Sequence, residues 1–138
     1  MKTIEKNTDF GILVLRVLVA GLLIFHGIDN FLSGYSFIKS MMAQSGLPEF
    51  MSYGAFIGEI IAPILIILGY KVRLASLFVA LTMLIAILTT HAEEILALNQ
   101  FGGWAIELQA FYLFGALAIF FTGSGKYAFS NKKALSIG

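Results

Sequence analysis

Four long apolar runs constrain this chain more than any other feature of its sequence. They cover about residues 10–32, 50–68, 74–91 and 104–122. A helix needs about 17–25 mostly apolar residues to cross the hydrocarbon core of a bilayer, and each run reaches that length. Because lipid offers no hydrogen-bond partners, a spanning segment must satisfy its own backbone N–H groups, which a helix does. We therefore predict an all-α protein in which a bundle of four transmembrane helices crosses the bilayer.

The composition agrees with a membrane location. The chain has 138 residues, enough for one domain over residues 1–138, and 59% of them are apolar but only 12% charged. An average soluble domain has about 25% charged residues, and a soluble chain this apolar would expose large patches. The formal net charge of +1 and the lack of a basic stripe argue against nucleic acid as a partner. The first run is too long for the core of a signal peptide, so we interpret it as a retained helix.

The positions of lysine and arginine orient the predicted helices. Seven of these residues fall on one side of the membrane, whereas the other side has only Lys39 and also holds Glu49, Glu93 and Glu94. Such a bias marks the cytoplasmic side, so we predict that both termini are cytoplasmic in a plasma or inner membrane. The seven are Lys2, Lys6, Lys71, Arg73, Lys126, Lys132 and Lys133.

The connection between the first two runs is too long for a tight turn. Several of its apolar side chains fall on one side of a helix, and Gly46 is placed to end that helix. We predict a short interfacial helix that lies along the outer membrane surface. Its apolar side would consist of Phe37, Ile38, Met41 and Met42.

Cysteine is absent from the chain. This excludes a dithiol redox motif, a disulfide framework and a zinc or iron–sulfur site held by cysteine. If the protein handles electrons, a bound small molecule must carry them.

Five ionisable residues inside the runs or at their ends are the candidate site residues. A charged group at bilayer depth costs about 2.5–3.5 kcal/mol on insertion scales, so such residues point to a function. At 1.5 Å per residue, His26 and Glu59 lie about 9 Å from the outer ends of their helices and Glu107 about 4.5 Å. With His91 at the outer end of the third run, each helix supplies one group to the outer third. Arg16 lies about 9 Å from the inner end.

A structural interpretation stands beside the functional one for Glu59. It could be a protonated residue that is hydrogen-bonded for packing. Pro63 follows four residues later and cannot donate to the carbonyl of Glu59, which predicts a kink and a free carbonyl. Gly54, Gly58 and Ala62 form a face of small residues beside it, which would let a neighbouring helix approach closely.

The other candidates have structural interpretations as well. His26 could anchor the outer end of its helix, or Asp29 or Asn30 on the same face could orient its imidazole. His91 could simply mark the water boundary. Glu107 stands in the first turn of its helix, where the helix dipole favours a carboxylate.

Arg16 stays charged at any physiological pH. It could pair with Glu59 or Glu107, cap carbonyls of a neighbouring helix, or extend toward the inner surface.

All four runs and the connections between them contain short motifs that are also found, in the same order, in a known family. They are Leu15-Arg16, Phe25-His26-Gly27, Gly46-Leu47-Pro48, Gly58-Glu59, Leu68-Gly69-Tyr70 with Arg73, Met83, Ala86 and His91, Gly102-Gly103-Trp104 with Glu107, and Gly123-Ser124-Gly125-Lys126-Tyr127. In this order they resemble the DoxX family of membrane proteins over nearly the whole chain. The resemblance implies a four-helix bundle and a link to redox chemistry, since members are associated with quinone-linked sulfur oxidation, quinone or catechol resistance, and membrane oxidoreductase complexes. By position, the Arg, His and Glu of the family correspond to Arg16, His26 and Glu59, whereas Asn30 stands where the family often has lysine.

We expect the chain to be a membrane subunit of a redox system that interacts with a quinone in the outer third of the bundle. The predicted cofactor-binding residues are His26, Glu59, Glu107, His91 and Arg16, and no catalytic residue or metal ligand is assigned. A quinone needs a planar apolar slot, a donor to each carbonyl oxygen and groups that pass protons. Its partners would be the bilayer and either an oxidoreductase subunit or a second copy of the chain.

Two other functions remain open at this point. His26 and His91 could be axial ligands of a haem, or the two histidines with Glu59 and Glu107 could hold one metal ion. Alternatively, the chain could be a non-catalytic assembly or scaffold protein. Its contacts would then lie on the small-residue face and on residues 35–45.

Overall fold

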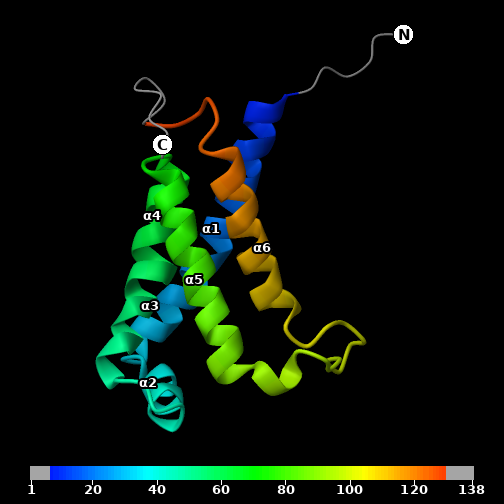
Figure 1. Ribbon diagram of the computed structural model, residues 1–138. Helices are drawn as coiled ribbons and strands as arrows, with labels where there is room; N and C mark the ends of the chain where they lie inside the picture. Colours follow the sequence, from blue (N-terminus) through cyan, green and yellow to red (C-terminus); the bar gives the residue numbers. More distant parts are fainter. Residues whose placement is uncertain (1–6, 130–138) are drawn as a thin grey trace.

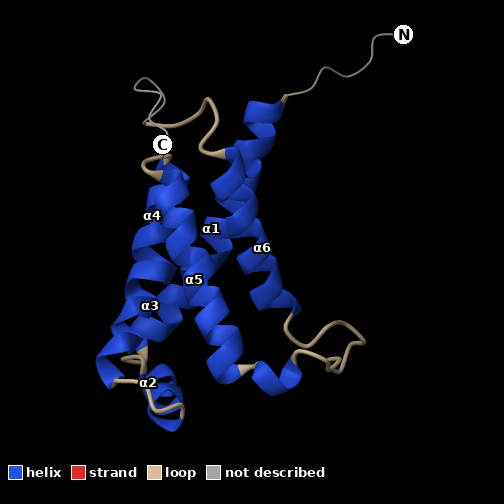
Figure 2. Ribbon diagram, in the orientation of Figure 1, coloured by secondary structure: helices blue, strands red, loops and turns tan. Residues whose placement is uncertain are grey.

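The computed structural model describes residues 7–129, and within that range the chain is helical. No strand forms there, although Leu98 and Trp104 make an isolated antiparallel bridge. Figure 1 shows the course of the chain, and Figure 2 shows helices joined by loops at both ends of the molecule. The predicted all-α class is confirmed for the described residues.

Helices follow the predicted apolar runs closely. The long helices are α1 (Thr8–Leu32), α5 (Val72–Thr90) and α6 (Glu107–Thr122), and the short helix α2 (Ser36–Gln44) lies between the first two runs. The second run is one continuous helical segment of mixed type. Its parts are a 3-10 turn (Glu49–Tyr53), α3 (Gly54–Phe56), a π-helical turn (Ile57–Ile61) and α4 (Ala62–Leu68).

Three segments are long and apolar enough to cross a membrane. They are α1, the continuous segment Glu49–Leu68, and Val72–Thr89 within α5. The fourth, α6, is apolar but has 16 residues, about 24 Å at 1.5 Å per residue. Its helix begins at Glu107 and not at Trp104, where the predicted run starts.

A loop closed by hydrogen bonds to Asn99 precedes α6, so this helix begins later than predicted. The side chain of Asn99 accepts hydrogen bonds from the backbone N–H groups of Phe101 and Gly103, at 2.9 and 3.0 Å. Gly102 between them has a φ of +84°, a left-handed conformation that favours glycine. Helical backbone therefore cannot form until this turn has ended.

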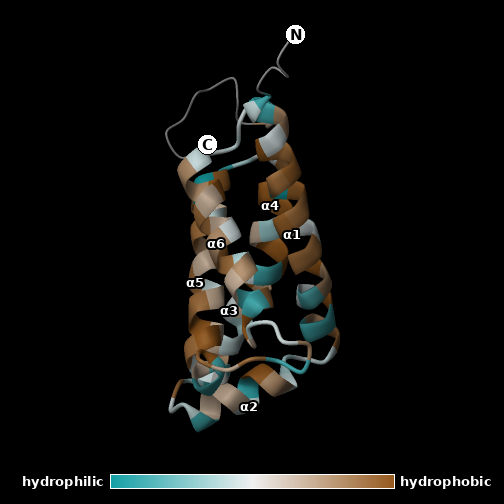
Figure 3. Cartoon of the chain, turned by 90° about the vertical axis from the view of Figure 1, so that its right-hand side faces the viewer, coloured by the Kyte–Doolittle hydropathy of each residue, from teal (hydrophilic) through white to brown (hydrophobic). Residues whose placement is uncertain are grey.

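The four apolar segments pack side by side. α1 contacts α4 and α6, and α5 contacts the same two helices. Between them lies a core of fully buried side chains that includes Val19, Leu23, Ile66, Val79 and Ile119. Many large apolar side chains are also exposed on the outside of the helices. Figure 3 shows that hydrophobic residues, in brown, make up much of each long helix. Such an apolar exterior is typical of a surface that faces lipid.

The short helix α2 occupies the segment for which an interfacial helix was predicted. It ends at Gln44, and Gly46 follows with a φ of +77°, so that the N–H of Leu47 can donate to the carbonyl of Met42 at 2.9 Å. Lys39 on α2 lies 4.8 Å from the ring centre of Tyr53. A hydrogen bond with Tyr53 raises the pKa of Lys39, which keeps this lysine cationic. The helix is thus held against the start of the second run.

The backbone around Glu59 departs from an α-helix. The π-helical turn Ile57–Ile61 contains Glu59 and ends two residues before Pro63. Proline lacks the N–H that an α-helix would use to reach the carbonyl of Glu59, and a π turn is one way to relieve this. A methyl group added to Gly27 of α1 would overlap this carbonyl, so α1 crosses directly over the distorted turn.

Within the predicted face of small residues, the close contact with a neighbouring helix is made at Gly58. A Cβ atom there would overlap the side chain of Thr82, so α5 packs directly on this glycine. Gly54 has no such neighbour within 4 Å among the described residues. Ala62 is buried, and the closest packing is therefore confined to the turn that carries Glu59.

Candidate functional site

Polar side chains from all four apolar segments line one cavity of about 250 Å³ near the end of the molecule that carries α2. Apolar residues such as Leu23, Met83 and Leu108 form the remaining wall. The polar lining residues are His26, Asn30, Glu59, His91, Gln109 and Tyr112. The cavity thus combines hydrogen-bonding groups with apolar surface, as ligand sites do.

Glu59 is the buried acidic group of this cavity. The residue is 7% exposed, and its Oε2 accepts a hydrogen bond of 2.7 Å from Nδ2 of Asn30 on α1. The π-helical turn carries Glu59 toward α1, where Gly27 leaves room for its backbone. A carboxyl group in such a place can hold or release a proton, depending on what lies in the cavity.

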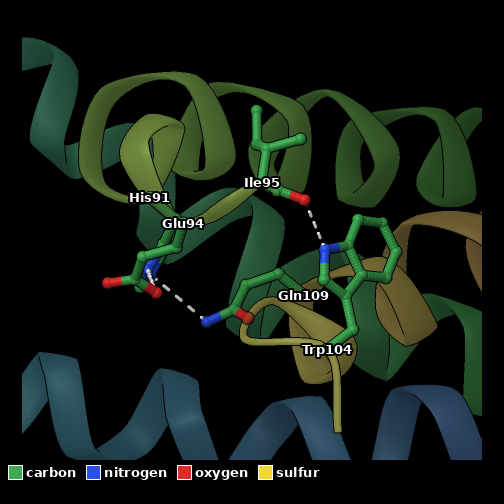
Figure 4. Close-up of polar contacts among 5 residues, drawn as sticks. All are labelled: His91, Glu94, Ile95, Trp104 and Gln109. Atoms are coloured by element: carbon green, nitrogen blue, oxygen red, sulfur yellow. Dashed lines mark hydrogen bonds and ion pairs between the residues drawn. The ribbon is translucent and has the colours of Figure 1, made fainter. Parts of the chain in front are cut away.

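His91 is held by polar partners on both sides of its ring. Its Nδ1 lies 3.2 Å from Oε2 of Glu94, and its Nε2 lies 3.2 Å from Nε2 of Gln109 on α6 (Figure 4). A neutral ring that is protonated at Nδ1 satisfies both contacts, because Nδ1 then donates to Glu94 and Nε2 accepts from Gln109. Glu94 therefore orients the histidine, as a carboxylate commonly does.

The loop that follows His91 is fixed to the start of α6. Nε1 of Trp104 donates a hydrogen bond of 2.6 Å to the carbonyl of Ile95 (Figure 4). The N–H of Ala105 also donates to the carbonyl of Ala97 at 3.0 Å. These bonds join the ends of α5 and α6, and so they hold His91 and Gln109 at a fixed separation.

His26 lies at the exposed side of the cavity. Its ring meets that of the buried Tyr112 edge to face, with 5.7 Å between the ring centres. Asn30, which the sequence offered as a partner for His26, gives its amide to Glu59 instead. The edge contact with Tyr112 therefore helps to hold the imidazole against α6.

Glu107 lies outside this cavity. It stands in the first turn of α6, and its Oε1 accepts a hydrogen bond of 3.2 Å from Nδ2 of Asn99. The carboxylate of Glu107 is therefore bound to the loop before α6 and does not line the cavity.

Arg16 lies at the other end of the molecule and is fully buried. Its Nε and Nη2 donate to the carbonyls of Ile66 and Ile67 in the last turn of α4, each at 2.9 Å. Its Nη1 donates to the carbonyls of Ser124 and Tyr127, at 2.8 and 2.7 Å. Of the roles left open by the sequence, the observed one is therefore the capping of carbonyls at a helix end, where a cation also suits the helix dipole.

Three polar lining residues escaped the sequence prediction of the site. Asn30 was considered only as a partner of His26, and Gln109 and Tyr112 were not among the candidates. Glu94, which orients His91, was considered only as an acidic residue on the outer side of the membrane. The available signal was that Gln109 and Tyr112 are three residues apart on one face of an otherwise apolar helix.

A second cavity of about 550 Å³ adjoins the first. It lies between α2, the Glu49–Ile61 part of the second run and α5, and most of its lining is apolar. Both cavities have Ile38, Glu59 and Ala86 in their walls. Glu59 therefore stands between a polar cavity and an apolar one.

The described residues do not form a cluster suited to a metal ion. No three histidine, aspartate or glutamate side chains within residues 7–129 come together in the way a metal site needs. In particular, Glu107 is bound to Asn99 and does not join His26, Glu59 and His91 in the cavity. These positions do not support the four-ligand metal site considered from the sequence.

The model of the DoxX family matches residues 11–92, which is 82 of the 138 residues. The chain belongs to the DoxX family. The matched range begins in α1 and ends just after His91, so it includes His26 and Glu59 but not α6.

One curated relative is also similar to this DoxX chain. It is a protein of Bacillus subtilis (strain 168) named "Putative oxidoreductase CatD", which is 31% identical over 89 residues. The match covers 64% of the present chain and 66% of the relative, just under two thirds of its length. No solved structure matches the chain. The family and the apolar helices together identify a membrane protein, and the name of the relative suggests a link to redox chemistry.

Proposed function

We propose that this DoxX protein binds a quinone in the polar cavity between α1, the π-helical turn, α5 and α6, as an integral subunit of a membrane redox system. One observation carries the proposal: His26, Glu59 and His91 line the same cavity as three further polar side chains. The name of the B. subtilis relative, "Putative oxidoreductase CatD", agrees with a redox role.

The residues around the cavity fit the needs of a quinone ring. The Tyr112 hydroxyl, the Gln109 amide and the His26 imidazole can donate to carbonyl oxygens, and Leu23, Met83 and Leu108 offer apolar surface to the ring. Glu59, which is buried and bound to Asn30, can hold a proton close to the ring. The bound quinone would supply the electron-carrying chemistry, and a partner oxidoreductase subunit would exchange electrons with it.

The proposal includes a topology. Four helical segments would span a plasma or inner membrane as one domain of residues 1–138, with both termini in the cytoplasm and α2 along the outer surface. Support comes from basic residues at the end opposite α2. Lys71 and Arg73 lie where α4 is followed by α5, Lys126 follows α6, and Figure 1 shows these parts of the chain at that end. The polar cavity would then lie in the outer third of the membrane, within reach of a quinone that diffuses in the bilayer.

Two matched variants test the quinone site. The full chain is placed in lipid nanodiscs, and the dissociation constants of ubiquinone and menaquinone analogues are measured for Glu59→Gln and Glu107→Gln. Both variants exchange a carboxylate for an amide of equal size, but only Glu59 lines the cavity. We expect Glu59→Gln to weaken binding about tenfold, or about 1.4 kcal/mol, and Glu107→Gln to leave it unchanged. Equal affinity in the wild type and Glu59→Gln would refute the role of Glu59.

A scaffold function is the second candidate, because part of the small-residue face is open. Nothing among the described residues lies within 4 Å of the place that a Cβ atom on Gly54 would take, so another protein could pack there. Under this alternative, Gly54→Leu would abolish co-purification with the partner, whereas His26→Ala combined with Glu59→Ala would not. Co-purification that survives Gly54→Leu would contradict the scaffold function.

A further inference from the structure

We infer that the ligand of this site is an amphiphile whose polar ring occupies the smaller cavity and whose apolar tail lies in the larger cavity beneath α2. The inference rests on the proposed function, because the ring is that of the proposed quinone. It adds the part of the molecule that recognises the tail, and with it the class of quinone that binds.

The two cavities share part of their walls. Glu59 on the π-helical turn, Ile38 on α2 and Ala86 on α5 belong to the walls of both. Ala86 is small, and Ile38 is only partly buried. A molecule that passes between them would place one end in each cavity, with Glu59 at the junction.

The two cavities differ in chemistry. The smaller one carries imidazole, amide, phenol and carboxyl groups from α1, α6, the π-helical turn and His91, which follows α5. On the α5 side of the larger one, the hydroxyls of Thr82 and Thr89 donate to the carbonyls of Phe78 and Ile85 in their own helix, at 2.8 and 2.7 Å. The hydroxyl protons of these two threonines are therefore used within α5, and most of the cavity lining is apolar, which suits a hydrocarbon tail and not a polar ring.

Size and access agree with this division. The smaller cavity, at about 250 Å³, lies below the range of about 300–1,000 Å³ that is common for sites of whole small molecules, whereas the larger, at about 550 Å³, lies within it. The larger cavity is flanked by exposed apolar side chains, including Ile57 and Leu81. A tail could therefore enter sideways from the surrounding lipid.

Two neighbouring residues of α5 give a matched pair of variants. Ile85 lines the larger cavity but not the smaller, and Leu84 lines neither. Both side chains are partly exposed, at 38% and 43%. Ile85→Trp should fill the tail cavity, and Leu84→Trp should add the same bulk to the outer surface of the same helix.

The test measures binding to the full-length protein in nanodiscs. The ligands are a dimethoxy-methyl benzoquinone without a tail and the same ring with a decyl chain, and concentrations are expressed per mole of lipid so that partitioning cancels. We expect the decyl form to bind at least about tenfold more tightly to the wild type and to Leu84→Trp. In Ile85→Trp this advantage should disappear, while binding of the tail-less ring should be unchanged.

Three results would overturn the inference, and they are distinguishable. Equal affinity of the two ligands for the wild type would leave the quinone site intact but remove the tail site. Displacement of the decyl form by an equal amount of a saturated fatty acid would show a general lipid groove instead. If neither ligand binds, the proposed function itself fails and the inference fails with it.

Discussion

Arg16 should be the residue on which the stability of the fold depends most. Its guanidinium makes four hydrogen bonds to backbone carbonyls, two at the end of α4 and two in the segment after α6. At about 1.5–3 kcal/mol for each bond to a charged group, the gross contribution is about 6–12 kcal/mol. Taking a guanidinium out of water costs several kcal/mol, so we expect Arg16→Met to lower the free energy of unfolding by about 3–5 kcal/mol.

A graded series distinguishes the hydrogen bonds from the charge. Arg16→Lys keeps the charge but has only three donors on one nitrogen, so it cannot reach both segments and should lose about 2 kcal/mol. Unfolding of the purified protein in mild detergent, followed by circular dichroism against added denaturing detergent, gives the differences. Lys126→Ala, at an exposed position of the same end, is the control. A loss of less than about 1 kcal/mol in Arg16→Met would refute the capping role.

Other predictions concern three further features. Burial raises the pKa of the Tyr35 hydroxyl, and the negative charge of Glu59 raises it further. This buried hydroxyl has no hydrogen-bond partner among the described residues. Tyr35→Phe should therefore leave stability unchanged or raise it by about 1 kcal/mol in the same assay, and a clear loss would contradict this. Gly27→Leu should prevent folding, seen as aggregation in size-exclusion chromatography, because a side chain would overlap the Glu59 carbonyl; a monodisperse product would contradict the packing. In intact cells a membrane-impermeant maleimide should label Gln44→Cys but not Lys126→Cys, and the reverse pattern would contradict the topology.

The sequence predicted most of the fold because the apolar runs have nearly the length of the helices. It could not predict where α6 begins, because that depends on how Asn99 bonds to the following loop. It also could not predict the π-helical turn. Pro63 predicted a kink near Glu59. However, a helix can accommodate the N–H that proline lacks either by a kink or by a π-helical turn, and the sequence does not tell which one forms.

The candidate site was harder to predict for a physical reason. Helices that are apolar nearly all round have no periodicity that tells which face turns inward. Depth along each helix could be estimated, and His26, Glu59 and His91 do line one cavity. Depth alone could not distinguish them from Glu107, whose carboxylate bonds with Asn99.

Polar residues that carry no charge were missed for a related reason. The free energy of inserting a side chain into a membrane is high for charged groups and so marks them as candidates. Asn30 and Gln109 are neutral amides, which this criterion does not mark. Each gains its importance from a partner on another helix, Glu59 for Asn30 and His91 for Gln109. Such partners become visible only when the helices are packed.

Photolabelling tests the central claim, the quinone site at Glu59, most directly. The full chain in nanodiscs is irradiated with an azido-quinone, and the labelled peptides are mapped by mass spectrometry with and without excess unlabelled quinone. We expect label that the competitor removes, confined to the π-helical turn with Glu59 and to the parts of α1, α5 and α6 that carry Asn30, Ala86 and Tyr112. Label spread over the lipid-facing side of α1 near Val14 and Leu18, and unaffected by the competitor, would contradict it.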